Sequence, residues 1–191
     1  MRILRKFVIG VLTFVVLFAA SLWATSLAIE PEPVGAAEAP HPESHPGAVV
    51  QVYGADVWGF RGKFAIHTWV ATKGENETEY TIYQVIGWRA RRGRSVVAVS
   101  EGDPARPWFG SPAVLLHDER GPGTQALVEQ VRAAVDAYPF PHEYTMWPGP
   151  NSNSFVAWIG LQVPELNLDL PTKAIGQAWM KNAYPDFAGL R

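Results

Sequence analysis

Three consecutive polar residues, Asn151-Ser152-Asn153, carry the side chains of this sequence that are best placed for chemistry. The turn Trp147-Pro148-Gly149-Pro150 precedes them, and apolar residues at i, i+3 and i+4 spacing follow, which predicts a helix beginning at the polar triplet. The N-terminus of a helix presents free backbone N–H groups and a partial positive charge. It can hold an anion, stabilise an oxyanion or activate a serine nucleophile. The plainer alternative is that Ser152 or Asn153 only caps the helix.

A histidine on a predicted strand is the candidate for a general base. Strand 63–71 alternates in character, so His67 shares one face with Trp69 and two alanines. It is either a core histidine hydrogen-bonded to the backbone or a base held on a rigid strand. Gln84 lies on the apolar face of strand 79–88, where a buried amide must find a partner. We therefore consider Gln84 a candidate for orienting His67, so the expected catalytic residues are His67, Ser152 and Gln84.

Aromatic and basic residues supply the candidates for ligand contact. Loop 103–112 places two large aromatic residues beside an arginine, and loop 89–94 contains four arginines. These residues suit a groove for a partly apolar, partly anionic ligand, whereas a lid over the core or a solvated loop is the alternative. The expected ligand-binding residues are Trp69, Arg89, Arg106, Trp108, Trp147, Asn151 and Asn153.

The composition bounds the class of protein. The chain has 191 residues, 48% of them hydrophobic and 12% aromatic, with a formal net charge of -2, which argues against disorder and against a general nucleic-acid binder. It contains no cysteine, so disulfides, thiolate metal sites and a cysteine nucleophile are excluded. The sequence has no phosphate-binding glycine loop, dinucleotide fingerprint or zinc-type ligand spacing, and we expect neither a cofactor nor a metal.

The N-terminal region predicts a membrane anchor. Basic residues precede a run from Phe7 to Ile29 that contains no charge, and this length favours a retained spanning helix over a shorter cleavable signal core. The positive flank would stay in the cytoplasm, so we expect a single-pass protein of the bacterial inner membrane whose domain faces the periplasm. Secretion to the periplasm after signal cleavage is the alternative. Residues 30–47 form a proline-rich linker, and residues 48–191 form one globular domain.

The domain has the pattern of an α+β fold. Strands are expected at 49–53, 63–71, 79–88 and 95–100, a short helical segment at 114–120, and longer helices at 124–137 and after residue 151. A final short helix is expected near 174–179. We predict an antiparallel sheet of four or more strands packed against two or three helices.

Several motifs resemble an uncharacterised bacterial family, DUF3750: His67-Thr68-Trp69, Tyr83 to Arg89, Pro107-Trp108-Phe109-Gly110 and Trp147 to Phe155. The resemblance spans about residues 49–179 and implies a bacterial envelope setting. A more distant likeness is to circularly permuted NlpC-type cell-wall peptidases of papain-like fold. In those proteins a histidine strand precedes a helix that opens with Asn-Cys-x-x-Phe, and Asn151-Ser152-Asn153-Ser154-Phe155 looks like that opening with serine in place of cysteine.

Two hypotheses of function follow. In the first, Ser152 is the nucleophile and His67 the base of a hydrolase or acyltransferase acting on cell-wall peptides or lipid-linked acyl groups, with Asn151, Asn153 and helix N–H groups stabilising the oxyanion. It requires His67 within hydrogen-bond reach of Ser152. In the second, the same cleft is a catalytically inactive module that binds an envelope ligand. A serine hydroxyl cannot ionise as a cysteine thiol does, and no carboxylate is placed to orient the base.

Overall fold

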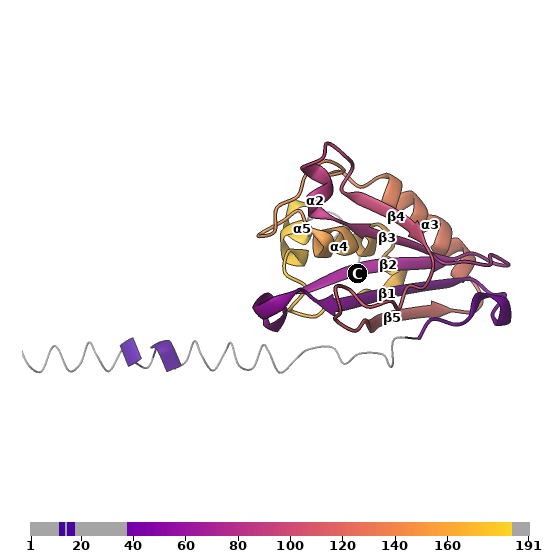
Figure 1. Ribbon diagram of the computed structural model, residues 1–191, viewed down its shortest axis with the longest axis horizontal. Helices are drawn as coiled ribbons and strands as arrows, with labels where there is room; N and C mark the ends of the chain where they lie inside the picture. Colours follow the sequence, from indigo (N-terminus) through magenta and orange to yellow (C-terminus); the bar gives the residue numbers. More distant parts are fainter. Residues whose placement is uncertain (1–11, 14, 18–37, 185–191) are drawn as a thin grey trace, which may run out of the picture. The chain divides into compact units, whose positions relative to one another are not determined.

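The computed structural model describes residues 12–13, 15–17 and 38–184, and the part from 38 to 184 belongs to one compact unit (Figure 1). The predicted anchor lies almost wholly outside the described residues. Among the helices that are described, none is long and apolar enough to cross a membrane.

Five antiparallel strands form one sheet in the order β4-β3-β2-β1-β5. Their bounds are β1 Val49–Asp56, β2 Ile66–Lys73, β3 Thr81–Val85, β4 Val97–Glu101 and β5 Val114–Arg120. The predicted α+β class with an antiparallel sheet is confirmed. The expected short helix at 114–120 is wrong, because this segment pairs with β1 from Val49↔Arg120 to Gly54↔Val114. It is the edge strand β5 of the sheet.

Helices cover one face of the sheet (Figure 1). The bounds of the α-helices are α2 Gly87–Ala90, α3 Thr124–Asp136, α4 Ser152–Gln162 and α5 Gln177–Ala183, and short 3-10 turns lie at η1 Pro42–Ser44, η2 Gly59–Lys63 and η3 Pro164–Leu166. Nearly every residue of α4 is buried, because it packs against β2, β3, α3 and α5 at once. An apolar sequence on all sides is what such a central helix requires.

The opposite face of the sheet carries a second, smaller core. Tyr53, Trp69, Ile82 and Leu115 are buried there, and loop residues that include Trp108 cover them. Alternation along the strands sends Val50, Val52 and Val70 to the helix side instead. The sheet is therefore buried on both faces, by helices on one and by loops on the other.

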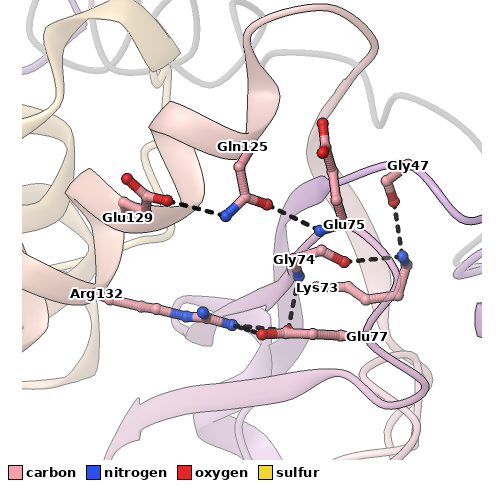
Figure 2. A network of polar contacts seen from close by, with 8 residues as sticks. All are labelled: Gly47, Lys73, Gly74, Glu75, Glu77, Gln125, Glu129 and Arg132. Atoms are coloured by element: carbon pink, nitrogen blue, oxygen red, sulfur yellow. Dashed lines mark hydrogen bonds and ion pairs between the residues drawn. The ribbon is translucent and has the colours of Figure 1, made fainter.

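A polar network ties the turn between β2 and β3 to α3 (Figure 2). It lies at the end of the sheet away from α2 (Figure 1). The Lys73 side chain is fully buried, and its Nζ donates to the carbonyls of Gly47 at 2.6 Å and Gly74 at 3.2 Å. Glu77 accepts from the Gly74 N–H at 2.7 Å and from Arg132 of α3 at 2.7 and 2.8 Å. The network therefore joins the end of the linker at Gly47, the turn between β2 and β3, and helix α3.

Replacing Glu77 by glutamine is expected to lower the free energy of unfolding by about 1 kcal/mol at pH 7, since the ion pair with Arg132 is partly exposed. Burial alone would raise the pKa of Glu77, but hydrogen bonds from Arg132 and from the Gly74 N–H outweigh it and hold the pKa below the ordinary 4.5. The carboxylate thus stabilises the fold above pH 4.5, and this contribution is lost as the pH falls through the lowered pKa.

Urea denaturation of the wild type, Glu77→Gln and the exposed Glu79→Gln control, at pH 7 and in acid, measures this contribution. The Glu77 variant should be the less stable of the two at pH 7, and its deficit should shrink in acid. Equal stability of the Glu77 and Glu79 variants at pH 7 would contradict the assignment.

Candidate functional site

The structure brings His67 of β2 and Gln84 of β3 together. Both side chains are buried on the loop-covered face, and Nε2 of His67 lies 3.1 Å from Oε1 of Gln84. A carbonyl oxygen only accepts, so with Oε1 as the partner Nε2 carries the proton and Nδ1 is the basic nitrogen. The predicted contact between these residues is confirmed.

His67 is a neutral imidazole at physiological pH. Burial lowers its pKa to about 4, and the hydrogen bond with Gln84 opposes this only in part. Burial has this effect because the charged imidazolium loses its hydration. A neutral ring with a free Nδ1 has the protonation state that a general base needs.

An aromatic stack covers the His67 ring. Trp108 lies parallel to the imidazole, with ring centroids 3.9 Å apart and planes at 13°, and Trp88 of α2 stacks on the indole of Trp108 at 6.1 Å. Trp69 is itself buried, and its indole N–H donates to the carbonyl of Pro104 at 2.9 Å. Trp69 thus supports the stack as part of the core, whereas Trp88 and Trp108 stand nearer the surface.

Asn151 is the residue that caps α4. Its Oδ1 accepts from the backbone N–H groups of Asn153 at 2.9 Å and Ser154 at 3.0 Å, while its Nδ2 donates to the carbonyls of Met146 and Ile175, both at 3.0 Å. One side chain thus fixes the helix start, the preceding turn and the segment before α5. Ser152 does not cap the helix, contrary to the plainer interpretation of the sequence.

Asn153 joins α4 to β2. Its Nδ2 donates to the carbonyls of Ile66 at 3.1 Å and Ile175 at 2.9 Å, and its Oδ1 accepts from the Thr68 hydroxyl at 2.9 Å. The amide donors of both Asn151 and Asn153 are therefore used structurally. They are not free to stabilise an oxyanion, and the remaining donor at this helix start is the backbone N–H of Ser152, which bonds to no described residue.

Ser152 is buried, and its hydroxyl makes no hydrogen bond to any described residue. The same turn of α4 contacts β2 on both sides of His67, through Ile66 and Thr68. Because neighbouring side chains of a strand alternate, Thr68 points toward α4 and His67 toward Trp108. The expected hydrogen bond between His67 and Ser152 is accordingly not formed in this structure.

Both residues nevertheless lie at the ends of their elements. Ser152 is the first residue of α4, and His67 is the second of β2, beyond the last β2–β3 pair at Val70↔Tyr83. No β3 residue pairs with this start of the strand. The start of β2 is still paired with β1, through Ala55↔His67 and Asp56↔Ile66, so the two side chains lie on opposite faces of the sheet.

The remaining expected ligand residues lie at the surface around this end of the sheet. Arg89 is partly buried, and its Nε donates to the Ser95 carbonyl at 2.6 Å, which closes its own loop. Arg106 is exposed beside Trp108, and Trp147 is 74% exposed in the turn before α4. Trp88 was not among the site residues expected from sequence. The predicted strand 79–88 placed it within the sheet, whereas β3 ends at Val85 and α2 begins at Gly87.

Within the part of the chain that the structure describes, no group of three or more His, Cys, Asp or Glu residues is arranged to hold a metal ion.

In comparisons with known proteins, the family model described as "Protein of unknown function (DUF3750)" matches residues 47–179, which is more than half of the chain. No curated protein and no solved structure matched. The matched segment contains the whole sheet, α4 and every candidate site residue.

Proposed function

This chain belongs to the DUF3750 family of proteins of unknown function, and on that premise we propose that its domain carries a Ser/His hydrolase or acyltransferase centre in the bacterial cell envelope. The substrate class is a cell-wall peptide or an acyl group. The uncharged run 7–29 would anchor the chain in the inner membrane with the domain in the periplasm, or would be cleaved on secretion.

The observation that carries the proposal is the unused hydroxyl of Ser152. Oγ of Ser152 is not among the described buried atoms that lack a partner, so this hydroxyl retains access to solvent although the residue is only 5% exposed. Here Asn151 caps the helix, so Ser152 has no structural task, yet it stands at the helix start and beside the strand that holds a neutral histidine. A nucleophile requires such a free hydroxyl.

The proposed reaction is an acyl transfer through the serine. As Oγ of Ser152 bonds to the carbonyl carbon of the substrate, Nδ1 of His67 takes the hydroxyl proton, and the carbonyl electron pair moves to oxygen, near the Ser152 N–H. When the tetrahedral intermediate collapses, the imidazolium returns that proton to the leaving group. Water or an acceptor hydroxyl or amine then attacks the acyl-serine. Gln84 would position the ring, so it is a positioning residue and not an acid or base.

Closing the pair requires movement at the start of β2. Catalytic hydrogen bonds are often long in ligand-free structures and tighten when substrate binds. β3 does not pair with β2 beyond Val70, but His67 pairs with Ala55 and its ring contacts Gln84 and Trp108, so the adjustment must break these ring contacts. The order of elements, a histidine strand, a polar residue on the next strand and a later helix with the nucleophile, supports the proposed relation to permuted papain-like domains.

Labelling with a fluorophosphonate probe tests the proposal, since its phosphorus forms a bond to an activated serine Oγ with loss of fluoride. We expect the full chain in detergent to be labelled and Ser152→Ala to lose labelling. His67→Gln should be labelled more slowly by a factor of about 100 or more. Ser154→Ala is the matched control, because its hydroxyl lies in the same helical turn but donates to the Gly176 carbonyl at 2.9 Å.

A Gln84→Glu variant sharpens the test. A carboxylate at this position would stabilise the imidazolium that forms during attack, so labelling should accelerate. Circular dichroism and thermal unfolding establish that each variant is folded. A folded wild type that no fluorophosphonate labels, or labelling that survives Ser152→Ala, would overturn the proposal.

The second candidate function is binding without catalysis. It is favoured by the stack on His67 and by the structural use of the Asn151 and Asn153 amides, which leaves few donors for an oxyanion. The exposed Phe109 and Arg106 beside Trp108 would then contact a ligand that is partly apolar and partly anionic. An unlabelled protein that still binds envelope ligands would establish this alternative.

A further inference from the structure

Exposed aromatic side chains gather at one end of the sheet. Strand β1 ends there, β2 begins there and β3 ends there, so the loops 57–65 and 86–96 lie at the same end. Loop 103–112 joins them through Trp108, which stacks on Trp88, and the turn before α4 joins them through Tyr144. We call the large exposed side chains of these loops the aromatic rim: Trp58, Phe60, Phe64, Trp88, Phe109, Tyr144, Met146 and Trp147.

Contacts link neighbouring members of the aromatic rim. Trp88 meets Phe109 edge to face at 5.8 Å, and the Tyr144 ring lies so close to Gly87 that an added Cβ would approach it to 2.6 Å. Phe60 of η2 and Phe64, which follows η2, pack edge to face with ring centroids 5.3 Å apart. Trp58 and Phe60 are still 77% and 72% exposed, so these rings project from the surface without a cover among the described residues.

Positive charge is concentrated on the same loops. Loops 57–65, 86–96 and 103–112 and the segment 139–150 hold seven of the chain's 16 Lys and Arg residues but two of its 18 Asp and Glu residues, Asp103 and Glu143. The seven are Arg61, Lys63, Arg89, Arg91, Arg92, Arg94 and Arg106. The whole chain has a net charge of -2, so this end is basic while the rest of the molecule is acidic.

We propose that the aromatic rim is a docking surface for a lipid bilayer that contains anionic lipids. Trp, Tyr and Phe favour the interface between headgroups and acyl chains, and surrounding Lys and Arg are attracted to anionic headgroups. Six of the eight aromatic rim residues are more than half exposed, which suits shallow insertion. Single-stranded nucleic acids also bind basic and aromatic side chains, but their bases stack on rings that line a groove. Trp58 and Phe60 instead project from the surface, at 77% and 72% exposure.

Docking would place the start of β2 and α4, with His67 and Ser152, close to the membrane surface. The binding itself does not depend on the proposed catalysis. If the hydrolase hypothesis fails, the aromatic rim still predicts membrane binding, and if membrane binding fails, serine labelling is unaffected. The two experiments therefore have separate readouts.

Sedimentation with lipid vesicles tests this inference. Residues 32–191 are used so that the uncharged N-terminal run does not bind lipid by itself; both core clusters lie within this segment, and circular dichroism and thermal unfolding check that it is folded. We expect binding to vesicles of phosphatidylcholine with phosphatidylglycerol at ~0.1 M salt, weaker binding at high salt, and little binding to phosphatidylcholine alone.

Two comparisons, each of a test variant with a control variant, show whether the aromatic rim and its surrounding arginines bind the vesicles. Trp58→Ser/Phe60→Ser should weaken binding about tenfold or more, whereas Val99→Ser, an exposed apolar residue on β4, should not. Arg91→Gln/Arg92→Gln should weaken binding to anionic vesicles, whereas Asn76→Asp/Thr78→Glu, with the same change in net charge at the opposite end of the sheet, should leave it nearly unchanged.

The expected blue shift of tryptophan fluorescence on vesicle binding would support insertion of the rings. The proposal would be overturned by a folded domain that does not bind anionic vesicles. It would also be overturned if the control variants weakened binding as much as the matched test variants. Binding to a single-stranded oligonucleotide in the absence of vesicle binding would overturn it as well.

Discussion

Replacing Asn153 by aspartate is expected to lower the free energy of unfolding by about 3–5 kcal/mol at pH 7. The substitution keeps the shape of the side chain but exchanges a donor for a charged oxygen. That oxygen would face the carbonyls of Ile66 and Ile175, which now accept from Nδ2 at 3.1 and 2.9 Å. The side chain is only 2% exposed, so water cannot compensate for the two lost hydrogen bonds or for the repulsion.

The deficit should depend on pH. Repulsion from two carbonyls and burial both favour the protonated acid, so the pKa of the new carboxyl is raised in the folded state. The penalty is then present above the ordinary aspartate pKa of about 3.9 and shrinks as the pH falls toward it. Chemical denaturation at pH 7 and near pH 4 measures this. The control is Asn182→Asp on the exposed side of α5, and an Asn153→Asp variant as stable as the wild type at pH 7 would show that Asn153 does not hold α4 to β2.

Local periodicity was sufficient to place the histidine and its partner. Alternation in strands 63–71 and 79–88 predicts that His67 and Gln84 lie on buried strand faces, and the structure joins them by a hydrogen bond. This succeeds because side-chain direction in a strand depends only on residue number. The same reasoning failed for residues 114–120. Alternation there is weak, since most of β5 is half-buried at the edge of the sheet and its pairing with β1 is non-local.

The helix start shows why local pattern alone could not choose the cap. Asn151, Ser152 and Asn153 are all good capping residues, so sequence preference does not separate them. Asn151 takes the position because its Nδ2 also reaches the carbonyl of Ile175, which comes from a segment 24 residues later. Asn153 likewise reaches back to β2. Tertiary contacts therefore determine that Asn151 caps α4 and that Asn153 binds β2, and they leave the Ser152 hydroxyl without a capping role.

Exposure of the aromatic residues was also a tertiary property. The sequence shows eight Trp and nine Phe, but it does not show which of them a core would absorb. Trp69 and Phe155 are buried, whereas Trp58, Phe60 and Trp147 are not. Loops far apart in the chain meet only because antiparallel pairing brings alternate strand connections to the same end of a sheet.

Acid is expected to destabilise the protein through His67. Its pKa is about 4 when folded, against an ordinary 6.5, so between these pH values the unfolded chain binds a proton that the folded state does not. The free energy of unfolding should therefore fall by about 3 kcal/mol as the pH drops from 6.5 to 4, with no contribution from this residue above 6.5. His117, whose pKa burial also lowers, adds to the slope.

Comparison of variants isolates the part due to His67. Between pH 7 and pH 4, chemical denaturation should show that the wild type loses about 3 kcal/mol more of its free energy of unfolding than His67→Gln does. A ring-proton NMR titration of His67 with a midpoint near 6.5 would contradict the burial argument. Because a base acts only when neutral, the same low pKa requires that fluorophosphonate labelling persist down to about pH 5 and fall only below it. Labelling that falls near pH 6.5 would assign the base to another group.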